Sequence, residues 1–289
     1  MSPRRNARAA APRAPARRPA TRGRTRALGQ HFLRDRSVVE QIVDLVAPTA
    51  RDLVVEIGPG RGALTETLAA RAGRLVALEI DAELAARLAQ RFAGRAHVEV
   101  RQADARHVDY RGLRALLPDA DGRVLVVGNL PYSVGKPILA ALVEAAPAID
   151  LMVLMLQKEV AVRVAAAPGG KTYGALSVLT QAACAARLAF TVPPGAFSPP
   201  PQVDSAVLAL RPHREPPVAI PDAARFATVV RAAFGQRRKS LANALAAGLG
   251  VPADRARQLI EAAGLDPGRR AETLSLEEFA RLARGPSAS

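Results

Sequence analysis

Residues 124–132 have the sequence Val-Leu-Val-Val-Gly-Asn-Leu-Pro-Tyr, and the expected architecture of the chain follows from this stretch. Its unbroken apolar run predicts a strand that is buried on both faces, as in a parallel sheet. Gly128 and Pro131 then predict that the strand ends in a rigid loop. Because ligands of open α/β sheets bind just beyond the carboxyl ends of the strands, we expect Asn129 and Tyr132 to lie at a binding site.

The side chains of this loop suit the recognition of a planar amine. Asn129 offers an amide oxygen that accepts and an amide nitrogen that donates, while Tyr132 offers a flat face on which a base can stack. Between them, Leu130 contributes a backbone carbonyl, and Pro131 fixes the backbone without adding an N–H group. The same four residues also fit an ordinary strand-end turn, so the loop alone leaves both interpretations open.

Strand and helix patterns alternate on both sides of this strand, which is typical of βαβ units. Apolar runs predict strands over 53–57, 75–78, 98–101 and 151–156, and helical periodicity predicts helices over 37–46, 62–71, 82–92, 137–144, from 158 onward and over 173–185. Two further strands, 187–192 and 203–210, flank a proline-rich loop and predict an antiparallel hairpin at the end of the sheet. The predicted fold class is α/β, with a doubly wound, Rossmann-like and mostly parallel sheet.

The strand signals stop after Pro212, and the rest of the chain predicts a small all-helical C-terminal domain. Helical patterns cover 222–234, 237–248, 253–263 and 275–283. Capping boxes predict two helix starts, Ser37 with Glu40 and Ser275 with Glu278. The predicted organisation is a basic arm over 1–26, an α/β domain over 27–212 and a helical domain over 213–289.

The composition is that of a globular protein, with 289 residues of which 49% are hydrophobic. No window reaches the roughly 18 consecutive apolar residues that a membrane span needs. The single cysteine, Cys184, lies within a predicted helix, where we expect a buried structural thiol. One cysteine excludes a disulfide within the chain and a cysteine-based metal site, and we expect no metal site. This cysteine usage fits a reducing compartment such as the cytoplasm.

The charge of the chain favours a polyanionic partner. Its 41 basic and 26 acidic residues give a net charge of +15, which favours nucleic acid over an anionic membrane. Nine of the arginines lie within residues 1–26, which contain four prolines and no acidic residue, so we expect a disordered basic arm there. A second basic group is a candidate phosphate-contacting surface, although a solvated helix face explains it equally well: Arg225, Arg231, Arg237, Arg238 and Lys239.

The loop after the first predicted strand, residues 56–62 (Glu-Ile-Gly-Pro-Gly-Arg-Gly), predicts a nucleoside site. Glycines there let a ligand approach the backbone and the following helix N-terminus. Gly58, Gly60 and Ala63 satisfy the loose dinucleotide pattern G-x-G-x-x-G/A, and Glu79 at the end of the next strand is placed for ribose hydroxyls. A nicotinamide dinucleotide is therefore one candidate ligand, and plain turn glycines are another explanation.

Two carboxylates favour S-adenosylmethionine over a dinucleotide. Glu56, directly before the turn, suits an ammonium or sulfonium group and would repel a pyrophosphate. Asp104, followed by Ala105, comes after the third strand, where its carboxylate can accept a hydrogen bond from an adenine amino group. Together with the glycine turn, Glu79 and Asn129, these residues equip four successive strand ends for a nucleoside. No hydride-handling His or Tyr-Lys pair supports an oxidoreductase.

The chain resembles the ribosomal RNA adenine dimethyltransferase family from about Leu28 to the C-terminal helices. The resemblance is carried by eight motifs: 29–33 (Gly-Gln-His-Phe-Leu), 56–60 (Glu-Ile-Gly-Pro-Gly), 79–81 (Glu-Ile-Asp), 104–105 (Asp-Ala), 129–132 (Asn-Leu-Pro-Tyr), 156–159 (Leu-Gln-Lys-Glu), 197–205 (Phe-Ser-Pro-Pro-Pro-Gln-Val-Asp-Ser) and 234–240 (Phe-Gly-Gln-Arg-Arg-Lys-Ser). The arginine-rich segment before Leu28 lies outside the resemblance.

The resemblance implies a class I methyltransferase fold with S-adenosylmethionine as methyl donor. The implied substrate is 16S rRNA in the small ribosomal subunit or its precursor, where two adjacent adenosines near the 3′ end become N6,N6-dimethyladenosine. A monomer is the default for an enzyme that docks onto a ribosome. Two alternatives remain open: the macrolide-resistance branch, which modifies large-subunit rRNA, and an assembly factor that acts mainly by binding immature small subunits.

The resemblance also implies which residues hold the cofactor: His31, Leu33, Gly58 with its loop, Glu79, Asp104 and Asn129. The family commonly has Asn where this chain has His31, and an imidazole can donate or accept a hydrogen bond in the same place.

Catalysis is expected to depend on positioning more than on a strong base. The lone pair of adenine N6 is delocalised into the ring, and acceptors such as Asn129 Oδ1 and the Leu130 carbonyl would favour a pyramidal, reactive amine. Phe197 lies in a loop stiffened by prolines. We expect this loop to hold the ring outward as a second stacking face, beside Tyr132, for an unstacked base. An ordinary core phenylalanine is the alternative interpretation of Phe197.

Overall fold

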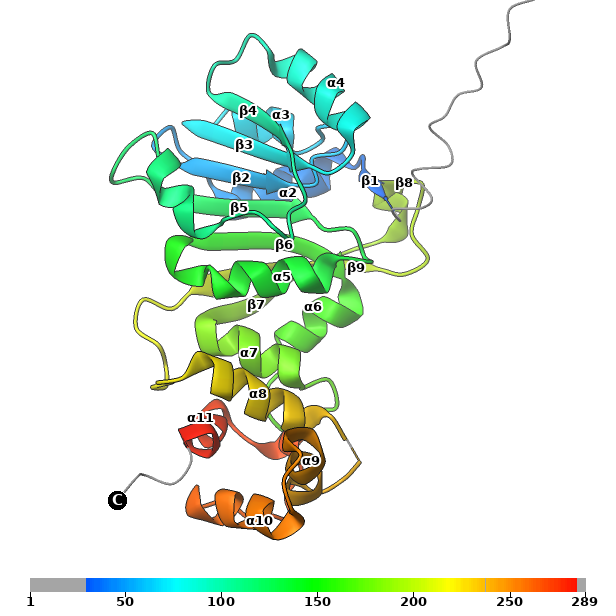
Figure 1. The fold of residues 1–289 in the computed structure, drawn as a ribbon. Helices are drawn as coiled ribbons and strands as arrows, with labels where there is room; N and C mark the ends of the chain where they lie inside the picture. Colours follow the sequence, from blue (N-terminus) through cyan, green and yellow to red (C-terminus); the bar gives the residue numbers. More distant parts are fainter. Residues whose placement is uncertain (1–29, 237, 285–289) are drawn as a thin grey trace, which may run out of the picture.

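The fold is built on a seven-stranded sheet with the strand order β4-β3-β2-β5-β6-β9-β7 (Figure 1). The computed structural model describes residues 30–236 and 238–284, so the basic arm predicted over 1–26 lies outside the described residues. In order across the sheet, the strands are β4 (Val98–Gln102), β3 (Arg74–Glu79), β2 (Leu53–Ile57), β5 (Val124–Asn129), β6 (Leu151–Gln157), β9 (Ser205–Pro212) and β7 (Cys184–Val192).

Strand β5 lies at the centre of the sheet, parallel to β2 on one side and to β6 on the other. Its register pairs Val124 with Leu53 and Leu125 with Leu151. Strand β9 runs antiparallel to both of its neighbours, β6 and β7. This arrangement confirms the predicted α/β class, with a mostly parallel sheet and an antiparallel hairpin at its end.

Strand β7 begins at Cys184 and not at the predicted Arg187, because helix α7 (Ala175–Ala183) ends before it. Cys184 is buried, as expected, but it pairs with Pro212 in the sheet instead of lying on a helix. Tertiary pairing with β9 therefore overrides the helix propensity of this alanine-rich segment.

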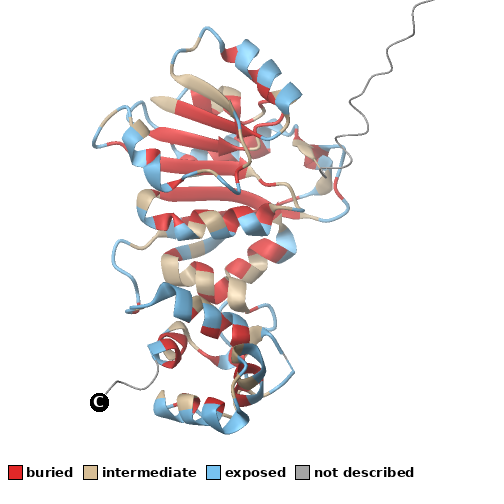
Figure 2. Ribbon diagram, in the orientation of Figure 1, coloured by how far each residue is buried: buried red, intermediate tan, exposed pale blue. Residues whose placement is uncertain are grey.

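Helices cover both faces of the sheet. One face carries α2 (Arg36–Val46), α3 (Thr65–Ala69) and α4 (Ala82–Phe92), and the other carries α5 (Gly135–Glu144), α6 (Lys158–Val164) and the 3₁₀ turn η1 (Arg111–Leu116). Side chains of a strand alternate between these layers, so that Val55 belongs to the core on the side of α5 and Val54 to the core on the side of α2. The central strands are therefore buried on both sides, as Figure 2 shows.

Helix α2 begins one residue earlier than the sequence predicts. The Asp35 carboxylate caps it by accepting hydrogen bonds from the backbone N–H groups of Ser37 (2.9 Å) and Val38 (3.3 Å). The predicted capping box of Ser37 with Glu40 is therefore wrong. A carboxylate at the N-cap position satisfies the free N–H groups of the first turn, which leaves Ser37 inside the helix.

The C-terminal helices α8 (Ala223–Phe234), α9 (Leu241–Leu249), α10 (Ala253–Ala262) and α11 (Leu276–Arg284) pack around a core of their own. Two residues from the region of α7 share this core: Tyr173, just before the helix, and Val178, within it. Helix α7 therefore joins these helices to the α/β layers. The boundary between residues 212 and 213 stays a prediction. Three short 3₁₀ turns complete the described structure: η2 (Ala146–Ala148), η3 (Pro194–Ala196) and η4 (Ala271–Thr273).

The capping box predicted for the last helix is confirmed. The backbone N–H of Ser275 donates to the Glu278 carboxylate at 2.8 Å, and the N–H of Glu278 donates to Ser275 Oγ at 3.2 Å.

Within residues 30–236 and 238–284, no helix combines the length and the apolar character needed to cross a membrane.

A separate two-stranded sheet, β1 (Phe32–Leu33) with β8 (Phe197–Ser198), lies beside the main sheet (Figure 1). Leu33 pairs with Phe197, and both side chains belong to the core under α2. Phe197 is only 2% exposed, so the prediction that the loop holds its ring outward is wrong. The prolines stiffen the backbone, but pairing with β1 directs the ring into the core, where burying its apolar surface is favourable.

Candidate active site

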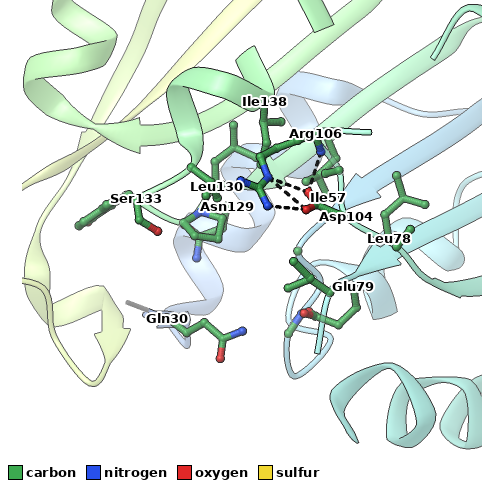
Figure 3. A pocket seen from close by; sticks show the side chains of 18 of the residues that line it. Gln30, Ile57, Leu78, Glu79, Asp104, Arg106, Asn129, Leu130, Ser133 and Ile138 are labelled. Carbon is green, nitrogen blue, oxygen red and sulfur yellow. Dashed lines mark hydrogen bonds and ion pairs between the residues drawn. The ribbon is translucent and has the colours of Figure 1, made fainter. Parts of the chain in front are cut away.

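A pocket lies beyond the carboxyl ends of β2, β3, β4 and β5 (Figure 3). Ten of the residues predicted for the site line it: His31, Gly58, Gly60, Glu79, Asp104, Ala105, Asn129, Leu130, Pro131 and Tyr132. The structure therefore brings the N-terminal segment and four separate strand ends to one place, as expected for a parallel sheet whose strands end at the same edge.

The glycine loop after β2 forms one wall of the pocket. Gly58, Gly60 and Gly62 have positive φ angles of 67°, 56° and 82°. A Cβ atom on Gly60 would also lie 2.8 Å from the Phe32 ring, so a side chain there would collide. Glycine alone satisfies both the conformation and the space. These turns also delay helix α3 to Thr65, later than the predicted start at residue 62.

Glu79, the last residue of β3, holds this loop from the neighbouring strand. Its carboxylate accepts hydrogen bonds from the backbone N–H groups of Gly60 at 2.9 Å and Asp81 at 3.0 Å. The side chain is buried, and burial raises the pKa of the carboxyl group. Each carboxylate oxygen accepts more than one hydrogen bond, so Glu79 retains acceptor capacity on the pocket side.

Glu56 lies behind the glycine loop and does not line the pocket. Its Oε2 atom is buried without a hydrogen-bond partner in the described residues. Burial raises the pKa of this carboxyl group to about 7. The Thr65 side chain, whose hydroxyl is also buried without another partner in this part of the chain, interacts with this carboxyl group and opposes the increase in its pKa.

Asp104 and Ala105 follow β4 and line the pocket. The Asp104 carboxylate is held by Arg106, whose Nη2 donates at 2.6 Å and whose backbone N–H donates at 2.9 Å (Figure 3). These hydrogen bonds lower the pKa of Asp104 to about 2. The carboxylate is therefore ionised throughout the physiological range.

Asn129 is oriented by a contact with the N-terminal segment. Its Nδ2 donates a hydrogen bond to the backbone carbonyl of His31 at 2.9 Å. A carbonyl oxygen only accepts, so this contact fixes which end of the amide faces His31 and leaves Oδ1 as the free acceptor end. Leu130 follows with its side chain buried and its N–H donating to the Met155 carbonyl at 3.0 Å, which anchors the loop to β6.

Tyr132 closes the same side of the pocket. Its hydroxyl lies 2.7 Å from Ser205 Oγ at the start of β9, and its ring centroid lies 5.4 Å from that of His31, at a tilt of 37°. Burial raises the pKa of the Tyr132 hydroxyl. The hydrogen bond to Ser205 thus fixes the hydroxyl end of Tyr132, and the residue lines the pocket.

Some predicted site residues lie outside this pocket. Leu33, Glu56 and Phe197 are buried behind it. In the predicted basic group, Arg225 and Arg231 are exposed on α8, and Arg238 and Lys239 are exposed in the turn that follows. Arg237 lies outside the described residues.

The pocket also contains residues that the sequence did not single out: Gln30, Phe32, Ile57, Leu78, Ile80, Ala103, Arg106, Ser133, Val134 and Ile138. Ile80 could have been predicted, because it is an apolar residue directly after the end of a strand, between Glu79 and Asp81. In the structure it is 44% exposed. Phe32 belongs to the 29–33 motif, but neither its ring nor Arg106 was expected in the pocket, because their places depend on the Gly60 loop and on Asp104.

The sheet order with its antiparallel β9, the glycine loop after β2 and the acidic end of β3 define a class I S-adenosylmethionine-dependent methyltransferase. The residues fit this cofactor, because the backbone of Gly58 and Gly60 lines the pocket beside two carboxylates, Glu79 at the end of β3 and Asp104 after β4. Residues 22–285 match the ribosomal RNA adenine dimethylase family, and the chain belongs to that family.

Relatives of known name cover almost the whole chain. The ribosomal RNA small subunit methyltransferase A of Geobacter metallireducens is 45% identical over 260 residues, covering 90% of this chain and 94% of the relative. The protein of the same name from Xanthomonas axonopodis pv. citri is 47% identical over 259 residues, covering 89% and 94%.

Two solved structures share the fold. A dimethyladenosine transferase from Plasmodium falciparum superimposes with a TM-score of 0.73 at 24% identity, over 87% of this chain and 96% of that one. The 23S rRNA methyltransferase ErmE superimposes with a TM-score of 0.63 at 28% identity, over 88% of this chain and 98% of that one.

Proposed function

We propose that this protein is a 16S rRNA adenine N6,N6-dimethyltransferase that modifies two adjacent adenosines near the 3′ end of the small-subunit rRNA. The small-subunit substrate is supported by the 45% and 47% identity to relatives named ribosomal RNA small subunit methyltransferase A. The observation that carries the chemistry is the orientation of Asn129, whose amide nitrogen is bound to His31 so that Oδ1 is left to accept a hydrogen bond.

Bound S-adenosylmethionine supplies a methyl group on a positively charged sulfur, which leaves as a neutral thioether. The task of the protein is to make N6 of the adenine a competent nucleophile. Asn129 Oδ1 and the Leu130 carbonyl accept hydrogen bonds from the two N6–H groups, which favours a pyramidal amine and aims its lone pair. Positioning provides the rate, and the proton leaves to water after the transfer.

The cofactor residues divide by the part of the ligand they meet. Gly58 and Gly60 allow the backbone to approach, and Glu79 accepts from the ribose hydroxyls. Asp104 accepts from the adenine amino group, with Ala105 beside it. His31 serves the aminoacyl end from the pocket wall, while Glu56 supports the glycine loop and Leu33 supports His31 from the core behind the pocket.

The target base stacks on Tyr132 in this proposal. An unstacked base loses its neighbours in the rRNA, and an aromatic face offsets that loss by about 1–3 kcal/mol per base. The bond between the Tyr132 hydroxyl and Ser205 keeps the ring in one orientation. Phe197, being buried, has a supporting role under β1.

The rRNA backbone meets the C-terminal helices. Arg225, Arg231, Arg238 and Lys239 are exposed there, and together with Arg237 they supply sequence-independent contacts to phosphates. We propose a monomer that works in the cytoplasm, where small subunits are assembled. Light scattering of the purified protein tests the monomer, and a dimer mass would refute it.

Two alternatives have support of their own. The 28% identity to ErmE favours a large-subunit rRNA methyltransferase, but it is lower than the identity to the small-subunit relatives. An assembly factor that binds immature small subunits without needing catalysis is the other alternative. The complete Asn-Leu-Pro-Tyr loop over 129–132 and its intact contacts favour retained catalysis.

One experiment separates the three functions. Undermethylated small subunits, and separately large subunits, are incubated with the protein and radiolabelled S-adenosylmethionine, and the rRNA nucleosides are analysed by mass spectrometry. We expect N6,N6-dimethyladenosine in small-subunit rRNA alone. Label in the large subunit would support the macrolide-resistance function, and tight binding of small subunits without label would support the assembly factor.

A further inference from the structure

Arg106 lines the pocket and turns back onto Asp104 (Figure 3). Its Nε lies 3.0 and 3.1 Å from the two carboxylate oxygens, and its Nη2 lies 2.6 Å from Oδ2. This is a forked contact, in which the planar guanidinium engages both oxygens of one carboxylate. The two residues are separated by a single position, so the pair is local in the sequence.

The pair occupies the acceptor that the base of the cofactor requires. A carboxylate offers about four acceptor positions, and the Arg106 side chain and backbone N–H take most of those on Asp104. His107 Nδ1 lies a further 3.6 Å from Oδ2. An adenine amino group that approaches Asp104 must therefore compete with hydrogen-bond donors that already occupy the carboxylate.

We propose that Arg106 competes with the adenine amino group for Asp104, so that the guanidinium closes the base end of the empty pocket and swings out when S-adenosylmethionine or S-adenosylhomocysteine binds. This inference rests on the proposed function, because it requires Asp104 to be the adenine acceptor. The side chains of Arg106 and Asp104 are 41% and 25% exposed, so water reaches the pair. Exposed pairs are weak, and this one opens easily.

The competition lowers the apparent affinity of the pocket. A ligand that binds only the open form has an apparent dissociation constant equal to its intrinsic value divided by the open fraction. The closed fraction slows association of the ligand and leaves its dissociation rate unchanged. Once the adenine of S-adenosylhomocysteine has left, Arg106 recaptures Asp104, which slows rebinding of the ligand.

The test compares Arg106→Ala and Arg106→Lys with the wild type by calorimetry, with S-adenosylhomocysteine as the probe. We expect Arg106→Ala to bind about 3–10-fold tighter at low salt, because the open fraction becomes complete. Its association rate in stopped flow should rise by a similar factor while the dissociation rate stays near the wild-type value, and Arg106→Lys should lie between. The difference should shrink in about 1 M salt, where the Debye length is about 3 Å.

Arg111→Ala is the matched control, because Arg111 pairs with Glu144 at an exposed position outside the pocket. It removes the same charge and should bind like the wild type. Unchanged or weaker binding by Arg106→Ala would overturn the proposal, since weaker binding would mean that the guanidinium helps to hold the ligand.

A third variant, Asp104→Ala, separates failure of this inference from failure of the proposed function. Loss of affinity in folded Asp104→Ala, with no change in Arg106→Ala, would overturn the role of Arg106 alone. Wild-type affinity in Asp104→Ala would remove Asp104 from the adenine site, and with it this proposal. No binding of the probe by the wild type would overturn the proposed function itself.

Discussion

His31 donates a hydrogen bond from its Nδ1 to the backbone carbonyl of Pro199, at 2.9 Å. Because a carbonyl oxygen only accepts, this contact places a proton on Nδ1. The backbone carbonyl of His31 in turn receives the Asn129 amide, and Ser205 binds the Tyr132 hydroxyl. The segment 199–205 therefore holds both ends of the Asn-Leu-Pro-Tyr loop, one through His31 and the other directly.

Replacing Asn129 by Ala should reduce methyl transfer by about 10²-fold or more, as for other groups that orient or stabilise a transition state. Monomethyladenosine should also accumulate in partly active variants, because the first methyl group removes one of the two N6–H donors and the second transfer depends more on positioning. Single-turnover assays with nucleoside mass spectrometry measure both effects. Asn243→Ala, on the exposed face of α9, is the control. Full dimethylation at the wild-type rate by Asn129→Ala would exclude Asn129 from the chemistry.

Replacing Glu79 by Ala should weaken cofactor binding by roughly 1–3 kcal/mol, the range for hydrogen bonds to a charged group. The loss has two sources, because Glu79 also holds the N–H of Gly60 and thus the glycine loop. Calorimetry with S-adenosylhomocysteine measures the affinity. Glu83→Ala, which removes an exposed carboxylate paired with Arg87, should leave it unchanged. Wild-type affinity in a folded Glu79→Ala variant would refute the assignment.

Phe197→Ala should lower the free energy of unfolding by about 3–5 kcal/mol, since it leaves a cavity in the core under α2. Val203→Ala is the control from the same loop, because Val203 is 46% exposed and its truncation should change stability little. Urea denaturation followed by circular dichroism measures both variants. A Phe197→Ala variant with wild-type stability and impaired rRNA binding would instead support a stacking role for this ring.

Glu56 should make the protein less stable as the pH rises. Its pKa is about 7 in the folded chain against an ordinary value of 4.5, so the folded state holds the proton that the unfolded state has lost. The contribution to stability is fully present below about pH 4.5 and is lost as the pH rises through 7. Glu56→Gln keeps the neutral form, and its stability relative to the wild type should increase by on the order of 2–3 kcal/mol between pH 5 and pH 8. Parallel pH profiles for the two proteins would contradict this prediction, and Glu83→Gln controls for an exposed carboxylate.

Deleting residues 1–26 should reduce the salt dependence of rRNA binding without changing the affinity for S-adenosylmethionine. The segment contains nine arginines, and each phosphate that the protein neutralises adds about 0.7–0.9 to the slope of log K against log salt. Filter binding over a salt series measures the slope. The double variant Arg231→Ala/Lys239→Ala tests the C-terminal basic group in the same way. An unchanged slope on deletion would show that the arm takes no part.

Elements with local signals can be predicted from the amino-acid sequence. The pattern of residues 82–92 predicts a helix, and α4 occupies that range, because its apolar residues recur at helical spacing and Asp81 caps its start. Strand β5 was equally clear, since a run of aliphatic residues between polar turns has few other solutions. The residues at four strand ends could be assigned to one pocket because parallel strands end at a common edge.

The contacts that hold the side chains of the site depend on long-range packing and could not be predicted from the sequence. Phe197 is buried because β8 pairs with β1, and Asn129 is oriented because the backbone of His31 lies beside it. Each contact joins residues that are distant in the sequence, and its geometry depends on how the intervening chain folds. The pair of Arg106 and Asp104 shows a different limit of sequence analysis. The sequence identified Asp104 as a site residue, but it did not predict that Arg106 would bind the Asp104 carboxylate. Composition and periodicity report which surfaces are buried, but hydrogen-bond partners are selected by distances that exist only after the elements have packed.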